Sequence, residues 1–179
     1  MPPEVMWQGK FITAVRDGRW EYVRRSRGIS AVVILAEHEG RIVLVEQQRV
    51  AIGGHCLELP AGLIGDGKGD DTIEAAARRE LAEETGFSAE HIDIVGEFCS
   101  SPGMVAESFT LVRARGLRRV DAGGGVDGED IVTHLVARSE ISEFIAAKRG
   151  EGVGIDVKLL LLLGQSMLAP VASGSGASV

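Results

Sequence analysis

The segment from Gly65 to Gly86 constrains this chain more than any other part of its sequence. It opens as a loop rich in Gly and Asp, GDGKGDD, and continues as a predicted helix that ends in RELAEETG. Glu80 lies three residues before Glu83 and four before Glu84, so in a helix the three carboxylates project from roughly one face. Like charges at this spacing repel and destabilise the helix. Either water solvates this acidic face, or a divalent cation binds there.

The overall charge of the chain bears on the same choice. The formal net charge is −7 at pH 7 over 179 residues, which disfavours a nucleic acid as a partner. An acidic protein that handles an acidic substrate needs cations. Mg²⁺ usually binds through a few carboxylates together with the phosphates of a substrate. We therefore expect a metal site rather than nucleic-acid binding.

Cysteine usage and hydropathy indicate the cell compartment. Cys56 and Cys99 follow no metal-ligand or redox spacing, so we expect buried free thiols, and nothing indicates an oxidising compartment. No signal peptide is recognisable. The longest apolar block near the C-terminus, residues 159–163, is too short to span a bilayer. We expect a cytoplasmic protein without a membrane segment.

Strand and helix patterns interleave along the chain, which predicts an α/β fold. Two β-branched apolar runs around Glu39-Gly40 predict a hairpin. The predicted strands are residues 29–37, 41–48, 57–59, 92–100, 107–114 and 131–137, and the predicted helices are residues 72–85, 139–148 and 156–168. This mixture suggests a sheet covered by helices on both faces.

Three parts of the chain differ in composition. Residues 1–28 form an N-terminal part, in which residues 11–28 are basic and mixed and predict one or two short strands with a turn at Asp17-Gly18. Residues 29–170 hold the interleaved strands and helices and are long enough for one domain. Residues 171–179 are rich in Ser, Gly and Ala, and we expect a mobile tail.

The segment from Gly65 to Gly86 resembles the Nudix box, Gly-x5-Glu-x7-Arg-Glu-apolar-x-Glu-Glu-x-Gly-apolar. Many fixed positions agree at once: Gly65, Arg79, Glu80, Leu81, Glu83, Glu84, Gly86 and Phe87. The resemblance implies a Nudix α/β/α sandwich with a mixed sheet. It also favours the metal site over a merely solvated acidic face.

Two features depart from the box. The Gly that follows Leu-Pro-Ala in many relatives is Gly62 here, which leaves the loop about three residues long for that register. The first Glu of the motif is Asp71 here, and in the family that Glu typically pairs with the motif Arg, which is Arg79 in this chain. Asp71 has a second interpretation as the N-cap of the helix, with Glu74 at the third helical position. Both roles are open.

The resemblance implies a set of metal ligands and catalytic groups. Mg²⁺, with Mn²⁺ as the alternative, is expected at Glu80, Glu83, Glu84 and Glu129, with help from the backbone carbonyl of Ala61. A plain turn at Pro60-Ala61-Gly62 is the structural alternative for that last position. Arg79, Glu83 and Asp127 are the expected catalytic residues, and Asp127 is the candidate general base. The loop from residue 123 to 130 is rich in Gly and acidic residues, and a polar loop without function is its alternative.

Other motifs are similar to the nucleotide-sugar branch of the family, the ADP-ribose and GDP-mannose pyrophosphatases. Arg suits phosphate because its planar fork binds in two-point fashion, and a surface Arg at a strand end is the alternative. The expected substrate-binding residues are Arg49, Glu58, Arg25, Trp20, Pro102 and Glu107. Members of this branch commonly exchange N-terminal strands across a homodimer. Trp7, Trp20 and Tyr22 are candidates to stack on the base, although aromatic residues in short strands also serve as core or interface.

The sequence therefore predicts Mg²⁺-dependent hydrolysis of a nucleoside-diphosphate sugar at its pyrophosphate. The products would be a nucleoside monophosphate and a sugar phosphate. The sequence does not choose between ADP-ribose and GDP-mannose. Two alternatives remain: hydrolysis of another nucleoside diphosphate derivative, and a catalytically inactive Nudix-fold module used for binding.

Overall fold

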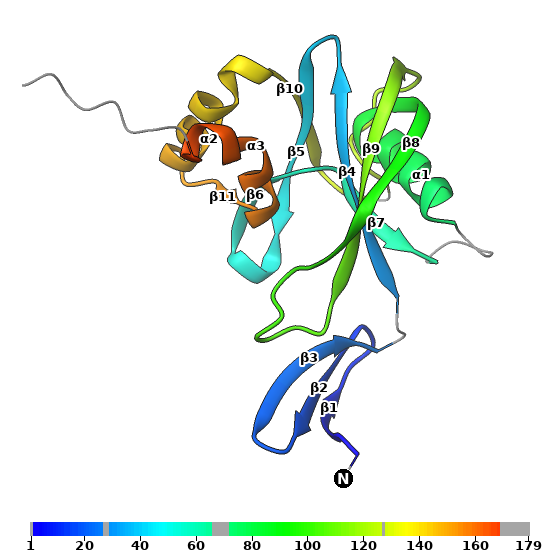
Figure 1. Ribbon diagram of the computed structural model, residues 1–179, viewed down its shortest axis with the longest axis vertical. Helices are drawn as coiled ribbons and strands as arrows, with labels where there is room; N and C mark the ends of the chain where they lie inside the picture. Colours follow the sequence, from blue (N-terminus) through cyan, green and yellow to red (C-terminus); the bar gives the residue numbers. More distant parts are fainter. Residues whose placement is uncertain (1, 27–28, 66–71, 127, 169–179) are drawn as a thin grey trace, which may run out of the picture.

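A computed structural model describes residues 2–26, 29–65, 72–126 and 128–168 of the chain. It has two sheets and three α-helices within these ranges (Figure 1). The strands are β1 (Glu4–Gln8), β2 (Ile12–Asp17), β3 (Trp20–Arg25), β4 (Ser30–His38), β5 (Arg41–Arg49), β6 (Gly54–Glu58), β7 (Ala61–Ile64), β8 (Phe87–Cys99), β9 (Ser108–Arg119), β10 (Ile131–Ala137) and β11 (Gly154–Ile155). The helices are α1 (Ile73–Thr85), α2 (Ile141–Gly150) and α3 (Leu160–Leu168).

The larger sheet is mixed and has two halves. In one half, β4 pairs in parallel with β9 and antiparallel with β7, and β9 pairs antiparallel with β8. In the other half, β5 pairs antiparallel with β10 and β6, and β6 pairs in parallel with β11. The halves are joined where β4 and β5 pair beside their turn, through Glu37–Ile42 and His38–Arg41. The predicted hairpin is thus confirmed.

Helices cover both faces of this sheet, and each face has its own core. On one face, Ala76, Ala77 and Leu81 of α1 pack on alternate residues of β4 and β9. On the other face, Ile141 and Ile145 of α2 pack with residues of β5, β6 and β10. Figure 1 shows α1 on one side of the sheet and α2 with α3 on the other. This arrangement is the expected α/β/α sandwich.

The N-terminal strands form a separate antiparallel sheet in the order β1-β2-β3. It lies beyond the N-terminal end of β4, next to the loop that joins β8 and β9 (Figure 1). Backbone hydrogen bonds tie β3 to that loop: the Val23 N–H donates to the Met104 carbonyl at 2.9 Å, and the Ala106 N–H donates to the Val23 carbonyl at 2.8 Å. Strand β1 was not predicted, because its mixed residues are all exposed and show no alternation of burial.

Helix α1 begins one residue later than predicted. Its N-cap is Thr72, whose side chain accepts a hydrogen bond from the Ala75 N–H at 3.2 Å. The prediction that Asp71 is the N-cap is therefore wrong, because Thr72 supplies an equally suitable capping oxygen one position closer to the helix. Asp71 itself lies outside the described residues. The helix ends as predicted at Gly86, which has a left-handed φ of 73°.

The observed start of strand β8 differs from the predicted one. Strand β8 begins at Phe87, directly after Gly86, and not at residue 92, because its first residues mix polar and apolar side chains at the edge of the sheet. The tail, residues 171–179, lies outside the described residues. Within the described ranges, no helix is both long enough and apolar enough to cross a bilayer.

Candidate active site

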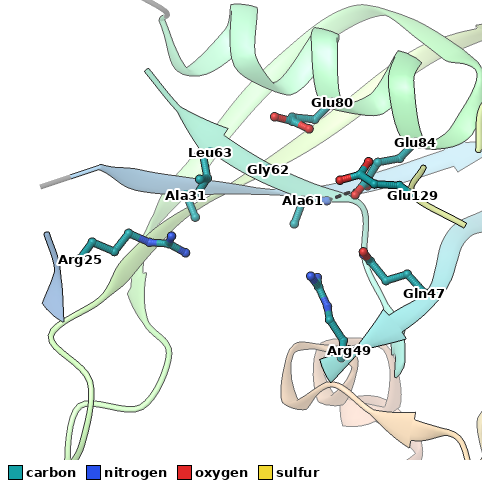
Figure 2. A pocket seen from close by; sticks show the side chains of 10 residues that line it. All are labelled: Arg25, Ala31, Gln47, Arg49, Ala61, Gly62, Leu63, Glu80, Glu84 and Glu129. Atoms are coloured by element: carbon teal, nitrogen blue, oxygen red, sulfur yellow. Dashed lines mark hydrogen bonds between the residues drawn. The ribbon is translucent and has the colours of Figure 1, made fainter. Parts of the chain in front are cut away.

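A cleft of about 410 Å³ lies between the C-terminal half of α1, strand β7 and the end of strand β5. Six of the residues singled out from the sequence line it: Arg25, Arg49, Ala61, Glu80, Glu84 and Glu129. Figure 2 shows the three carboxylates together near α1, with the guanidinium groups of Arg25 and Arg49 reaching into the same space. The cleft therefore combines an acidic wall with two cationic side chains.

Glu84 is the most deeply buried carboxylate of this wall. Its residue is 5% exposed, and its Oε2 accepts a hydrogen bond from the Ala61 N–H at 3.1 Å. Burial raises the pKa of Glu84 to about 8, against the opposing hydrogen bond from Ala61, and the nearby charge of Glu80 adds to the rise. A carboxylate in this state is destabilised as an anion until a cation neutralises it.

Glu80 lies against the backbone of strand β7. A Cβ added at Gly62 would fall 1.8 Å from the Glu80 Cδ, so the absence of a side chain at Gly62 makes room for this carboxylate. Burial raises the pKa of Glu80, and the charges of Glu83 and Glu129 also raise it, although Arg79 opposes them. The charges of Glu83 and Glu129 thus disfavour the ionised form of Glu80, and the charge of Glu80 disfavours the ionised form of Glu84.

Arg79 lies beside these carboxylates and ties them to strand β7. One Nη atom donates to Glu80 Oε1 at 2.7 Å and approaches Glu83 Oε2 at 3.5 Å, and the other donates to the Leu63 carbonyl at 3.1 Å. Glu83 itself is about one third exposed and does not line the cleft. The predicted pairing of Arg79 with Asp71 stays a prediction, because Asp71 lies outside the described residues.

The donor set suits a hard divalent cation. Carboxylate oxygens are the ligands that Mg²⁺ takes in proteins. Burial and, to a lesser extent, neighbouring acids raise the pKa values of Glu80 and Glu84, and a bound cation would offset both effects. Among the described residues, no three acidic or histidine groups already surround a single point.

Arg49 is held by a buried acid at the opposite wall. Its Nε and one Nη donate to the two carboxylate oxygens of Glu58 at 2.6 and 2.7 Å, and Glu58 is only 5% exposed. This two-point hydrogen bonding raises the pKa of Arg49. Glu58 was expected to line the site. It lies behind Arg49 instead, because both of its oxygens are directed at the guanidinium.

Arg25 connects the main cleft to a second one of about 510 Å³. Its Nε donates to Glu107 Oε1 at 2.6 Å, which links β3 to the start of β9. Glu107 lines the second cleft with Tyr22 and Arg24. Arg25 and Glu107, which were both expected to bind substrate, are thus brought together beside the acidic wall.

Trp20 and Pro102 line a third, smaller hollow of about 270 Å³. It lies between β3 and the loop that joins β8 and β9, and Tyr22 and Ala106 border both this hollow and the second cleft. Trp20 is 63% exposed, so its ring is accessible. The structure does not place Trp20 or Pro102 in the main cleft within this chain.

Glu129 reaches the cleft from the loop that precedes β10. Its Oε2 accepts a hydrogen bond from the Val126 N–H at 3.2 Å, and its own N–H donates to the Val126 carbonyl at 3.1 Å. A tight turn thus presents this carboxylate to α1. The candidate base, Asp127, lies outside the described residues.

Sequence reasoning missed Gln47, Leu63 and Ala31 as lining residues. Gln47 could have been found, because it lies two residues before Arg49 in a strand and therefore faces the same way. Leu63 takes part through its backbone carbonyl, and no side-chain pattern signals such a role. Ala31 lies in β4 where β7 pairs with it, so only the strand register places it here.

The raised pKa of Glu84 predicts how the stability of the metal-free protein depends on pH. The folded protein keeps the proton on Glu84 up to about pH 8, whereas an unfolded chain releases it near 4.5. Between these values the folded state binds more protons than the unfolded state, so this group lowers the free energy of unfolding as pH rises. Urea unfolding in EDTA should show this decline between pH 5 and pH 8, and Glu84→Gln should flatten it. Identical pH profiles for the two proteins would contradict the burial of a titrating Glu84.

Replacing Gly62 with Ala is expected to weaken divalent-ion binding with little change in stability. The new Cβ would collide with the flexible end of Glu80, which can turn aside at low cost to the fold. We expect an affinity for Mg²⁺ that is about 10–100-fold lower, the usual effect of disturbing the support of a ligand. Gly150→Ala is a matched control, since no atom lies within 4 Å of its Cβ position. Calorimetric titration measures both variants, and equal affinities would refute the contact.

Comparisons with known proteins agree with this geometry. The model of the NUDIX domain family matches residues 26–151. This range includes every lining residue of the main cleft except Arg25. The crystal structure of an ADP compounds hydrolase superimposes with a TM-score of 0.68 at 19% identity, covering 93% of this chain and 92% of that one. The predicted fold is confirmed by this likeness.

Three curated relatives show how the sequence similarity is distributed. The methanol dehydrogenase activator of Bacillus methanolicus is 33% identical over 130 residues, which are 72% of this chain and 68% of that protein. The GDP-mannose pyrophosphatase of Klebsiella pneumoniae is 33% identical over 172 residues, 91% of this chain and 81% of that protein. The ADP-sugar pyrophosphatase of Mus musculus is 38% identical over 94 residues, 48% of this chain and 42% of that protein.

The cleft and these matches together identify the family of the chain. The helix that carries the acidic wall is the helix of the Nudix box, and the family model covers more than half of the chain. The chain belongs to the Nudix family.

Proposed function

We propose that this protein hydrolyses the pyrophosphate bond of a nucleoside-diphosphate sugar with the help of Mg²⁺. The observation that carries the proposal is a single cleft in which Glu80, Glu84 and Glu129 face Arg25 and Arg49. A pyrophosphate carries negative charge on both phosphates, so it needs cations on each side. Relatives named GDP-mannose pyrophosphatase and ADP-sugar pyrophosphatase support the choice of substrate class.

The two arginines would bind the phosphate oxygens. Glu58 holds the Arg49 guanidinium by Nε and one Nη, which leaves its other Nη free to donate into the cleft. Arg25 is held through its Nε by Glu107, and its guanidinium group points into the cleft (Figure 2). Each arginine is thus fixed before substrate arrives, which reduces the entropy lost on binding.

The acidic wall would hold Mg²⁺ through Glu80, Glu83, Glu84 and Glu129, with the Ala61 carbonyl as a further oxygen ligand. When bound, the ion would neutralise phosphate charge and make a bound water more acidic. Arg79 would keep Glu80 and Glu83 oriented, because it already contacts both. Mn²⁺ would serve in the same place, since it accepts the same oxygen ligands.

The reaction itself is a displacement at phosphorus by water. Asp127 would take a proton from the attacking water as the water oxygen bonds to one phosphorus atom. The bridging P–O bond breaks, and its electron pair leaves with the second phosphate. The products are a nucleoside monophosphate and a sugar phosphate, with no oxidant or reductant required.

We further propose that the protein acts in the cytoplasm as a homodimer joined through its N-terminal sheet. This sheet, with the turn that joins β1 and β2, exposes many large apolar side chains, including Trp7, Phe11, Ile12 and Trp20. Such a surface fits a second copy of the chain. Trp20 would then lie near the base of a nucleotide, as its position in an accessible hollow allows.

A panel assay tests the proposed function. Purified protein is incubated with Mg²⁺ and each of several substrates: ADP-ribose, GDP-mannose, other nucleotide sugars, a dinucleoside polyphosphate and a nucleoside triphosphate. A phosphatase that acts on monoesters then releases phosphate from the products. We expect phosphate from at least one nucleotide sugar, at a higher rate than from the other classes. No release from any compound would indicate a binding module instead.

A further inference from the structure

The C-terminal end of α1 is capped by a distant segment of the chain. The last carbonyls of a helix have no partner within it. Here the Gly125 N–H donates to the Glu83 carbonyl and the Gly124 N–H donates to the Glu84 carbonyl, both at 2.9 Å. Thr133 Oγ1 of β10 donates to the same Glu84 carbonyl at 3.3 Å. The backbone of two candidate ligand residues is thus bound to the loop that leads to Glu129.

The approach between these two segments is too close for side chains. A Cβ at Gly123 would lie 2.4 Å from the Thr85 carbonyl carbon and 2.5 Å from the Gly86 nitrogen, and a Cβ at Gly86 would lie 2.2 Å from the Asp121 oxygen. Backbone atoms cannot turn aside as the end of a side chain can. The φ values of Gly123, Gly124 and Gly125 are 72°, 107° and 85°, which favour glycine. Gly86 and Gly123 therefore serve close backbone packing in the described structure.

This packing fixes the backbone position of Glu129. The Ile131 N–H donates to the Gly124 carbonyl at 3.3 Å, so the chain returns to the glycines directly after Glu129. A Cβ at Gly125 would lie 2.7 Å from both Cβ and Oε2 of Glu129. Glu129 is consequently held between the turn at Val126 and the helix end that carries Glu84.

We propose that Gly123–Gly125 and Thr133 form a glycine clamp that positions Glu129 against Glu83 and Glu84 and so sets the affinity for a divalent cation. The members of the clamp touch neither ion nor substrate, and they act through the three carboxylates as positioning residues. The clamp rests on the proposed function, because the three carboxylates are assigned there as ligands.

The test is a Mn²⁺ titration without substrate, in which electron paramagnetic resonance reports the free ion. Gly123→Ala is expected to bind Mn²⁺ about 10–100-fold more weakly than the native protein. Gly40→Ala is the matched control, because Gly40 has a similar φ of 74° and no atom within 4 Å of its Cβ position. The control should bind like the native protein, and circular dichroism should show that both variants are folded.

Thr133→Val provides a second, milder change that keeps the shape of a β-branched residue. Loss of its hydrogen bond to the Glu84 carbonyl should weaken Mn²⁺ binding about fivefold, the effect of one neutral hydrogen bond. Thr133→Ser, which keeps the hydroxyl, should bind Mn²⁺ with the affinity of the native protein. This pair decides the question if Gly123→Ala does not fold.

Native affinity in folded Gly123→Ala, or in Thr133→Val, would overturn the clamp. So would an equal loss in Gly40→Ala. The same titration on Glu84→Gln and Glu129→Gln separates this failure from failure of the ion site. If these two variants bind Mn²⁺ as the native protein does, the ion site is wrong. If they bind weakly and Gly123→Ala does not, only the clamp is wrong.

Discussion

Glu84→Gln is expected to lower turnover of the nucleotide sugar by at least about 100-fold, while the protein remains folded. Removing even an outer-shell partner of a metal ligand costs 10–100-fold, so loss of a ligand should cost no less. Gln has the size of Glu, and its amide oxygen can still accept the hydrogen bond from the Ala61 N–H. The variant removes a buried carboxylate whose pKa is about 8, so the metal-free fold should be as stable as before or more stable.

The experiment measures turnover and urea unfolding on the same preparations. Glu74→Gln is the matched control, since Glu74 lies on the same helix but does not line the cleft. The control should keep its turnover. Near-native turnover of Glu84→Gln in saturating Mg²⁺ would remove Glu84 from the ion site.

Asp127→Asn is expected to lower turnover by about 10²–10⁴-fold, the contribution of a general base. Substrate and ion binding should change little, because the proposed role of Asp127 is confined to the proton transfer. The limb of the pH–rate profile that reports the base should disappear. Asp130→Asn is the control, since Asp130 is an exposed acid of the same loop.

Glu107 is the second candidate for the general base. If Asp127→Asn keeps full turnover and an unchanged pH profile, the base lies elsewhere, and Glu107 is next in order. In the structure, Glu107 is paired with Arg25: its Oε1 accepts a hydrogen bond from the Arg25 Nε at 2.6 Å. Glu107→Gln should therefore act mainly on substrate binding through Arg25, which KM reports.

The parts of the fold that depend on local patterns could be predicted from the sequence. The hairpin of β4 and β5 follows from two apolar runs beside Glu39-Gly40, and Gly86 marks the end of α1. The N-cap was misplaced because Asp71 and Thr72 are both good capping residues, and local propensity does not choose between them. Strand β1 was missed because its side chains are exposed and show no periodic burial.

The parts of the site that depend on long-range packing could not be predicted. The spacing of Glu80 and Glu84 indicates a shared helix face, but it does not show that Glu84 is the buried member. The two-point pairing of Arg49 with Glu58 requires the register of β5 against β6. The glycine clamp joins segments about 40 residues apart, as the Gly124 N–H to Glu84 carbonyl hydrogen bond shows. From the sequence, the same glycines suggest a flexible loop.

The proposed function depends on cleavage of the pyrophosphate bond of the substrate by water. Its most direct test is hydrolysis of the best nucleotide sugar in H₂¹⁸O with Mg²⁺, followed by mass spectrometry of the products. We expect a nucleoside monophosphate and a sugar phosphate, with one ¹⁸O atom in the phosphate of one of them. A nucleoside diphosphate with a labelled free sugar would place the cleavage at the glycosidic bond and contradict it.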